Sequence, residues 1–205
     1  MDTPVYLSGP TYGPPEFNSY CAFMNGQPGD KQRGGVATRA APSRRMRIVE
    51  AHDQPISEVY EVLSKLLLGA HESVLQSSGL TTDGLLRLKP IVEQCLSQVG
   101  SYQLIIDGEA AATKFKSKDY DWLRNNPKVR SRVSPEPVNH WIIVDGRNMR
   151  LENPHSEGDA TLRHNVVIVD AEPDIAARAR AIFEGWWALS VDIQTWQPTT
   201  TGSIE

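Results

Sequence analysis

VNHWIIVDGRNMRLENPH, residues 138–155, is the stretch from which the fold is most directly inferred. It holds an almost wholly apolar run at residues 141–144, an Asp145-Gly146 pair, and a second short run at residues 149–152. An apolar run of this length is typical of a strand covered on both faces, and Asp-Gly is a strong turn signal between strands. The stretch therefore predicts two neighbouring strands, the first of them in the middle of a sheet.

On both sides of this stretch, helical and strand periodicities alternate along the chain. Pro90 should bend its helix or delay the start of that helix, because proline lacks the backbone N–H. Residues 165–169 are apolar enough for another central strand. The order of elements predicts an α/β domain with a mixed sheet. Helices are predicted at residues 55–68 (capped by Asp53), 84–99, 118–124 and 172–189, and further strands at 73–77, 102–106, 129–133 and 165–169.

The composition of the chain changes near residue 46. Proline and glycine are concentrated before that point, and both disfavour a segment that folds by itself. We therefore predict a disordered Pro/Gly-rich tail at residues 1–46, with a basic segment at residues 31–47. The folded domain is expected at residues 47–191, followed by a flexible C-terminal tail at residues 192–205.

Charge is distributed unevenly along the chain. Residues 1–30 carry a charge of −3 and residues 31–49 a charge of +6. Because the net charge of the chain is −4, residues 50–205 carry −7. A dedicated reader of duplex DNA usually has a basic face on its folded domain, and an acidic body argues against that class. Contact with nucleic acid is therefore expected only through the basic segment at residues 31–47.

The cellular setting is inferred from what the sequence lacks. No window approaches 18 uninterrupted apolar residues, so no transmembrane helix is expected, and residues 1–30 do not have the pattern of a secretory signal. Cys21 and Cys95 are too few for a disulfide framework and match no zinc spacing. These observations favour a cytoplasmic protein, with Cys95 a buried, inert thiol on a helix face.

Residues 138–155 and 165–189 together resemble one half of the phospholipase D-like (HKD) superfamily. In that family a strand carries H-x-K-x-x-x-x-D followed by glycine, a Gly-Ser-x-Asn element follows the next strand, and a later strand and aspartate lead into a helix ending in F-x-x-x-W. The resemblance spans about residues 46–190 and implies a phospholipase D-like mixed sheet flanked by helices. The matching features are Asp145-Gly146, the strand and aspartate at residues 165–170, and Phe183 with Trp187.

The chain departs from this family at the residues that perform its chemistry. Counting back from Asp145, the position of the nucleophilic histidine holds Val138, and the lysine position holds His140. Residues 152–155, Glu-Asn-Pro-His, replace the Gly-Ser-x-Asn element. The family's histidine attacks phosphorus while lysine and asparagine stabilise the phosphoryl oxygens, and valine has no lone pair with which to attack. The resemblance therefore implies a degenerate domain that lacks the catalytic His/Lys pair.

Four polar side chains remain as candidates for a ligand site: His140, Arg150, Glu152 and His155. Residues two apart share a face of a strand, so Arg150 and Glu152 point the same way, and pairing of the two strands would bring His140 toward them. Arg150 and a protonated histidine would hold an anion, and Glu152 would orient a histidine. Two histidines with a carboxylate are also a possible set of metal ligands, but the spacing matches no standard metal motif, and we predict no metal and no cofactor.

Each candidate also has a purely structural interpretation. His140 suits a hydrogen-bonded core histidine, Arg150 and Glu152 an edge-strand ion pair of little energetic value, and His155 the end of a strand. The Trp186-Trp187 pair is expected to pack on the sheet rather than on a ligand.

Three hypotheses follow for function. The sequence favours a non-catalytic ligand-binding or protein-interaction module, sensory or regulatory, that binds an anionic or polar small molecule or a protein partner. The alternative is a phosphodiesterase or phosphotransferase in which His140 acts as nucleophile or acid, with His155 and Glu152 as further catalytic candidates, in a homodimer that brings two half-sites together. The third is a structural subunit that docks on a larger assembly through its N-terminal tail.

Overall fold

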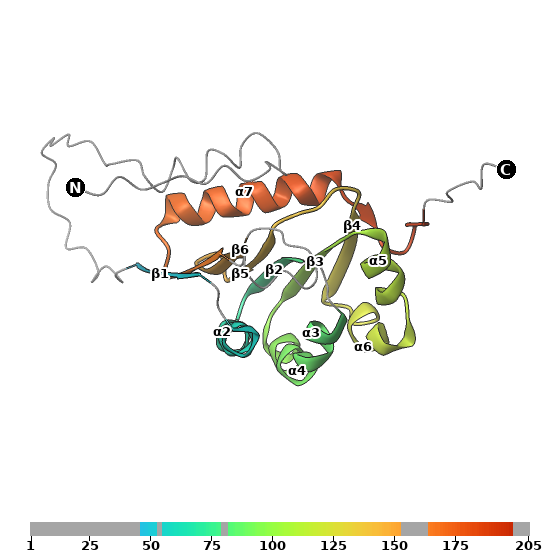
Figure 1. Cartoon of the computed structure of the whole chain (residues 1–205), viewed down its shortest axis with the longest axis horizontal. Coiled ribbons are helices and arrows are strands. Elements are labelled where there is room, and N and C mark those ends of the chain that lie inside the picture. The colour runs from blue at the N-terminus through green and yellow to red at the C-terminus, as the bar shows by residue number, and fades with distance from the viewer. Residues whose placement is uncertain (1–45, 53–54, 79–81, 153–163, 199–205) are drawn as a thin grey trace, which may run out of the picture. The chain divides into compact units, whose positions relative to one another are not determined.

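The protein is described by a computed structural model that covers residues 46–52, 55–78, 82–152 and 164–198. Its centre is an eight-stranded mixed sheet in the order β1-β7-β6-β5-β2-β3-β4-β8 (Figure 1). β2, β3 and β4 run parallel, and the remaining neighbours pair antiparallel. The strands are β1 Arg47–His52, β2 Ser73–Ser78, β3 Ser101–Asp107, β4 Val129–Ser134, β5 His140–Val144, β6 Asn148–Glu152, β7 His164–Val169 and β8 Val191–Asp192.

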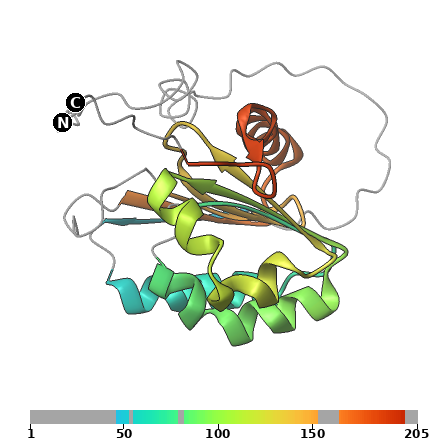
Figure 2. The same cartoon turned by 90° about the vertical axis from the view of Figure 1, so that its right-hand side faces the viewer.

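Helices lie on both faces of this sheet (Figure 2). α7, Pro173–Leu189, crosses one face. The other helices of the described chain contribute side chains to one core cluster on the opposite face. They are α2 Ile56–Leu68, α3 Thr82–Arg87, α4 Lys89–Gln98, α5 Glu109–Phe115, the 3-10 helix η1 Lys118–Tyr120 and α6 Asp121–Arg124. The layering and the mixed sheet confirm the predicted fold class.

β5 contributes to both sides of the sheet, as the alternation of its side chains predicts. Ile142 and Val144 belong to the core cluster beneath α2 and α4. Trp141 points the other way, and its ring meets that of Trp186 on α7 at a centroid distance of 4.7 Å. The predicted packing of Trp186 on the sheet is confirmed. β5 is therefore covered on both faces, which explains why residues 141–144 are so uniformly apolar.

Proline interrupts the predicted helix at residues 84–99 more strongly than a bend. α3 ends at Arg87, and α4 begins at Lys89 with Pro90 in its first turn. The first turn tolerates proline because its N–H has no intrahelical partner there. Two helices thus replace the predicted one. The predicted cap of α2 at Asp53 lies outside the described residues, and α2 follows Pro55.

The edges of the sheet differ from the sequence-based expectation. β1, which was not predicted, pairs with β7 over its whole length, so β7 is second from the edge and not central. At the other edge the chain continues to pack beyond the predicted boundary at residue 191. Ile193 is buried and Trp196 packs against the core. No helix in the described ranges is both long and apolar enough to cross a bilayer.

Cys95 has the surroundings of an inert thiol. It is fully buried on α4, and burial, helped by the negative charge of Asp145, raises the pKa of the thiol to about 11. The thiolate is the nucleophilic form, so the native protein should hold very little reactive Cys95 at neutral pH. We expect a Cys21→Ser variant to release almost no signal with a thiol reagent until it is unfolded. Stoichiometric labelling under native conditions would contradict this assignment.

Candidate functional site

Polar side chains gather where several neighbouring strands of the sheet end or begin. The parallel strands β2, β3 and β4 end there, with Asp107 and Ser134 paired at the ends of β3 and β4. The antiparallel strands bring the start of β5 and the end of β6 to the same end of the sheet, where His140 lies opposite Glu152. In α/β sheets, ligands bind characteristically outside the carboxyl ends of the parallel strands. This end of the sheet is therefore the candidate functional site.

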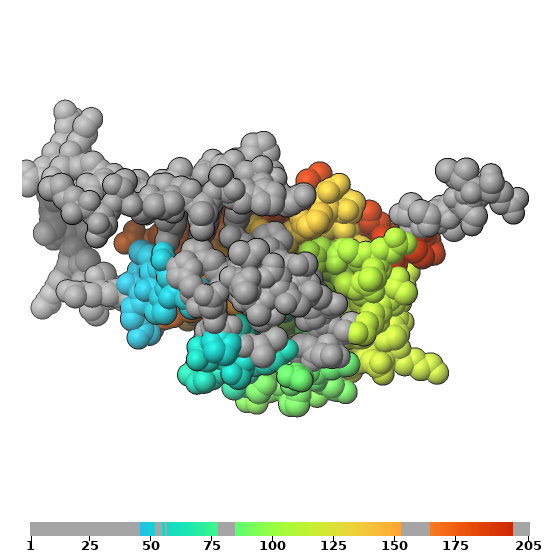
Figure 3. Space-filling view, in the orientation of Figure 1, coloured from blue at the N-terminus to red at the C-terminus, as the bar shows by residue number. Residues whose placement is uncertain are grey.

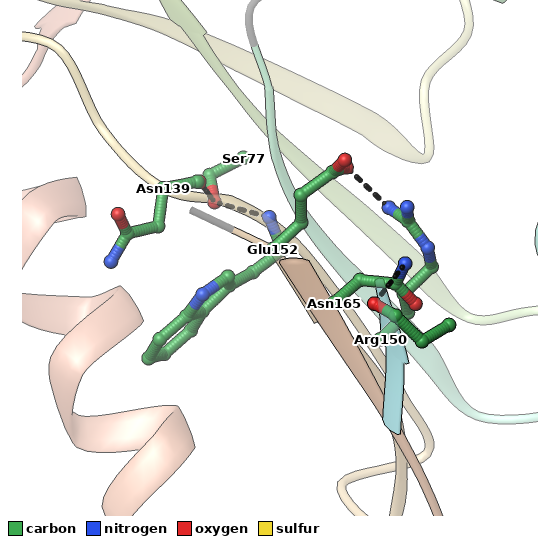
Figure 4. Close-up of polar contacts among 7 residues, drawn as sticks. Ser77, Asn139, Arg150, Glu152 and Asn165 are labelled. Atoms are coloured by element: carbon green, nitrogen blue, oxygen red, sulfur yellow. Dashed lines mark hydrogen bonds and ion pairs between the residues drawn. The ribbon is translucent and has the colours of Figure 1, made fainter. Parts of the chain in front are cut away.

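Arg150 and Glu152 form a buried ion pair on β6. The Arg150 Nη1 donates to Glu152 Oε2 at 2.6 Å, and the two side chains are only 4% and 6% exposed (Figure 4). The interpretation as an edge-strand pair is wrong, because β6 lies between β5 and β7. The pair is shielded from water, so its charges interact strongly while each bears a large desolvation cost.

Much of the hydrogen-bonding capacity of Arg150 is left unused. Its Nε and Nη2 atoms are buried, and no residue in the described chain accepts a hydrogen bond from either of them. These two nitrogens lie along one side of the planar guanidinium, where their N–H bonds point in parallel and match two oxygens of a carboxylate or phosphate. Glu152 accepts from Nη1, and the Nε/Nη2 side of the guanidinium has no acceptor among the described residues.

Of the two remaining candidates, only His140 lies within the described residues. His140 is half-buried at the first residue of β5, and its cross-strand partner is Glu152. In regular antiparallel strands such paired residues share a face, and Arg150 and Glu152 lie on β6 directly beside this position. His155 lies outside the described residues. The structure thus places three of the four predicted ligand-binding residues, His140, Arg150 and Glu152, at neighbouring positions of β5 and β6.

Val138 packs as an ordinary apolar residue. It precedes β5, its side chain is 3% exposed, and its backbone N–H donates to Asp107 Oδ2 at 3.4 Å. A buried hydrocarbon therefore occupies the position at which the resemblance places a nucleophilic histidine.

Asp145 has a structural role that the sequence pattern did not reveal. Its carboxylate accepts backbone hydrogen bonds from His71, Glu72 and Ser73 at 2.7–3.2 Å, which ties the β5–β6 turn to the start of β2. Burial alone would raise the pKa of Asp145, but these N–H groups and Arg147 outweigh it and hold the pKa below its usual value. Asp145 and Gly146 both have positive φ, 52° and 61°. Such angles favour glycine and are tolerated by aspartate, which accounts for the Asp-Gly pair.

Three buried polar residues near the site were not identified from the sequence: Ser77, Asn139 and Asn165. Ser77 contacts the backbone on both sides of His140, and Asn165, the cross-strand partner of Glu152, donates from Nδ2 to the Ala51 carbonyl oxygen at 3.5 Å. A polar residue within an otherwise apolar strand, as at Asn165, is the signal that could have indicated such a role. Ser77 carried no comparable signal.

Metal binding receives no support from the described part of the chain. Across residues 46–52, 55–78, 82–152 and 164–198, no three His, Cys, Asp or Glu side chains are grouped closely enough to hold a metal ion.

Sequence comparison finds no matching family model and no matching curated protein. Solved structures, by contrast, resemble the chain over most of its length. Nuc from Salmonella typhimurium, a phospholipase D family member, has a TM-score of 0.54 and 14% identity, and the match covers 72% of this chain and 98% of that one. NucT from Helicobacter pylori has a TM-score of 0.53 and 14% identity, with 72% and 99% covered.

A DNA-binding protein is also among the structural neighbours. The archaeal chromatin protein TrmBL2, whose structure shows a novel mode of DNA binding, has a TM-score of 0.54 and 11% identity over 75% of this chain. The chain spans little more than half of that protein, 56%. At these identities the comparisons establish the fold, which is phospholipase D-like.

Proposed function

We propose that this chain is a non-catalytic, phospholipase D-like module that binds an anionic ligand through Arg150. The observation that carries the proposal is the buried Nε/Nη2 fork. A buried N–H of a charged group that lacks an acceptor costs free energy, and an anion seated on the fork recovers it. A sensory or regulatory role suits a site that binds without turnover.

The charge of the site indicates which anions suit it. Glu152 already neutralises Arg150, so the pair offers an oriented fork with little net positive charge. A singly charged group with two equivalent oxygens is therefore favoured over a dianion. His140, opposite Glu152 in the sheet, would add a positive charge when protonated. The DNA-binding activity of the chromatin protein agrees with an anionic ligand but does not distinguish among anions.

Val138 is the reason to expect no catalysis. Phosphoryl transfer through a covalent intermediate needs a nucleophile with a lone pair, and this position holds a buried hydrocarbon. A hydrolase of this fold would therefore have to use His140 in an attacking role, which is the competing hypothesis.

Arg150→Lys tests the proposal. Lysine keeps a positive charge beside Glu152 but has no planar fork, so the fold should persist while anion binding is lost. In a thermal-shift panel of acetate, dimethyl phosphate, inorganic phosphate, nucleotides and sugars, a ligand at 100 times its Kd should raise the Tm of the wild type by about 5–10 °C. The same ligand should raise the Tm of Arg150→Lys by less than a third of that.

Turnover provides the control. The wild type and His140→Ala should both leave bis-p-nitrophenyl phosphate intact, with or without divalent metal. Hydrolysis by the wild type that His140→Ala abolishes would establish the competing hydrolase. Equal stabilisation of the wild type and Arg150→Lys by a ligand would show that Arg150 does not bind that ligand.

A further inference from the structure

Ser77 is fully buried near the end of β2, directly opposite Trp141 of β5. Its hydroxyl group donates to the carbonyl oxygen of Asn139 at 2.6 Å and accepts the backbone N–H of Trp141 at 3.3 Å (Figure 4). These two backbone groups immediately precede and follow His140. A single side-chain oxygen from a neighbouring strand thus holds the backbone on both sides of the candidate histidine.

The backbone at His140 forms a tight turn. The N–H of Trp141 also lies 3.1 Å from the carbonyl oxygen of Asn139, a contact between residues two apart that makes His140 the central residue of a three-residue turn. Such a turn is not regular strand geometry, so β5 alone does not determine the direction of the His140 side chain. Ser77 Oγ joins both ends of the turn.

Ser77 has no donor to spare for chemistry. A serine hydroxyl carries one proton, and here that proton is directed at the Asn139 carbonyl oxygen. The residue after His140 is held independently, since the Trp141 ring packs on Trp186. The carbonyl oxygen of Asn139 accepts from the Trp141 N–H within the turn and from the Ser77 hydroxyl, and of these two donors only Ser77 belongs to a neighbouring strand. Loss of Oγ would therefore leave the Asn139 side of the turn without its bond to β2.

We propose that Ser77 is the positioning residue of the site: its hydroxyl sets the turn that directs the His140 imidazole toward the face of the Arg150–Glu152 pair. The effect on ligand binding rests on the proposed function, whereas the effect on the orientation of His140 does not. Ser77 acts through His140 and is not itself a ligand contact.

Ser77→Ala and Ser77→Cys test this role, and Ser77→Thr and Ser131→Ala are the controls. Alanine removes the hydroxyl, and cysteine replaces it by a weak donor and acceptor of similar shape, so that a folded variant lacking the strong bonds is available. Threonine restores the hydroxyl. Ser131 is a buried serine on β4 and controls for the general cost of altering a buried serine.

The readout is the NMR titration of the His140 imidazole, assigned with a His140→Gln variant. We expect Ser77→Ala and Ser77→Cys to move the titration midpoint by about 0.5 pH unit or more, a size that altered surroundings readily produce. Ser77→Thr and Ser131→Ala should leave it in place. The affinity for the anion identified in the thermal-shift panel should fall about tenfold in the first pair, equivalent to 1.4 kcal/mol.

The outcomes separate the two claims. An unchanged His140 titration in Ser77→Cys and Ser77→Ala, with a loss of stability like that of Ser131→Ala, would overturn the positioning role. A shifted titration in a protein that binds no anion of the panel would support the positioning role and contradict the proposed function.

Discussion

Arg150→Met should destabilise the protein by about 3–5 kcal/mol, the usual cost of removing one partner of a buried ion pair. Glu152 is 6% exposed and would remain in the interior without the arginine charge 2.6 Å away. The free energy of unfolding, measured by urea denaturation and linear extrapolation, gives the loss directly. Arg150→Lys should retain most of the stability, because it keeps a cation beside Glu152.

The double variant Arg150→Met/Glu152→Leu shows whether the pair is kept for stability or for binding. Replacing a buried ion pair by apolar residues of similar volume is often neutral or stabilising, by about 1–4 kcal/mol. We expect the double variant to be at least as stable as the wild type and to bind no anion. A double variant that is clearly less stable than the wild type would show that the pair mainly supports the fold.

Asp145→Asn should cost about 2–3 kcal/mol of stability at neutral pH, because hydrogen bonds to charged groups are worth more than neutral ones. Oδ1 accepts the N–H groups of Glu72 and Ser73, and Oδ2 accepts that of His71. The amide keeps only one acceptor oxygen, so its N–H₂ group must face at least one of these backbone donors. Urea denaturation of the variant measures the loss. Asp119→Asn, an exposed carboxylate on η1, is the matched control and should change stability very little.

The difference in stability between the wild type and Asp145→Asn should depend on pH. The pKa of Asp145 is lowered in the folded protein, so its stabilising contribution is fully present above the unfolded value of about 3.9 and is lost as the pH falls through the folded value. The difference in unfolding free energy between the wild type and Asp145→Asn should therefore shrink on acidification below pH 4. A difference that stays constant down to pH 2 would mean that the carboxylate charge is not what holds the turn.

Much of the fold was predictable because its signals are local. The apolar run of β5, the breaks between helices and the Asp145-Gly146 turn all follow from neighbouring residues. β1 was missed because its sequence, RIVEAH, lies next to the basic segment and has no strong apolar alternation. As an edge strand it needs only one partner, β7, and that partner is more than a hundred residues away in the chain.

The candidate site was less predictable. Arg150 and Glu152 were recognised as sharing a face, but strand order decides whether such a pair is exposed or buried, and β6 turned out to be an interior strand. Ser77 was invisible as a site residue, since its link to His140 depends on the pairing of β2 with β5.

From its sequence alone this protein is committed to a tight Asp-Gly turn and to an α/β sheet, because short-range backbone preferences and side-chain periodicity do not depend on distant residues. Only the tertiary structure decides that one side of Arg150 has no acceptor among the described residues, that Asp145 holds the start of β2, and that Ser77 bonds to the backbone on both sides of His140. Those relations join residues far apart in the chain, and they exist only once the strands are ordered side by side.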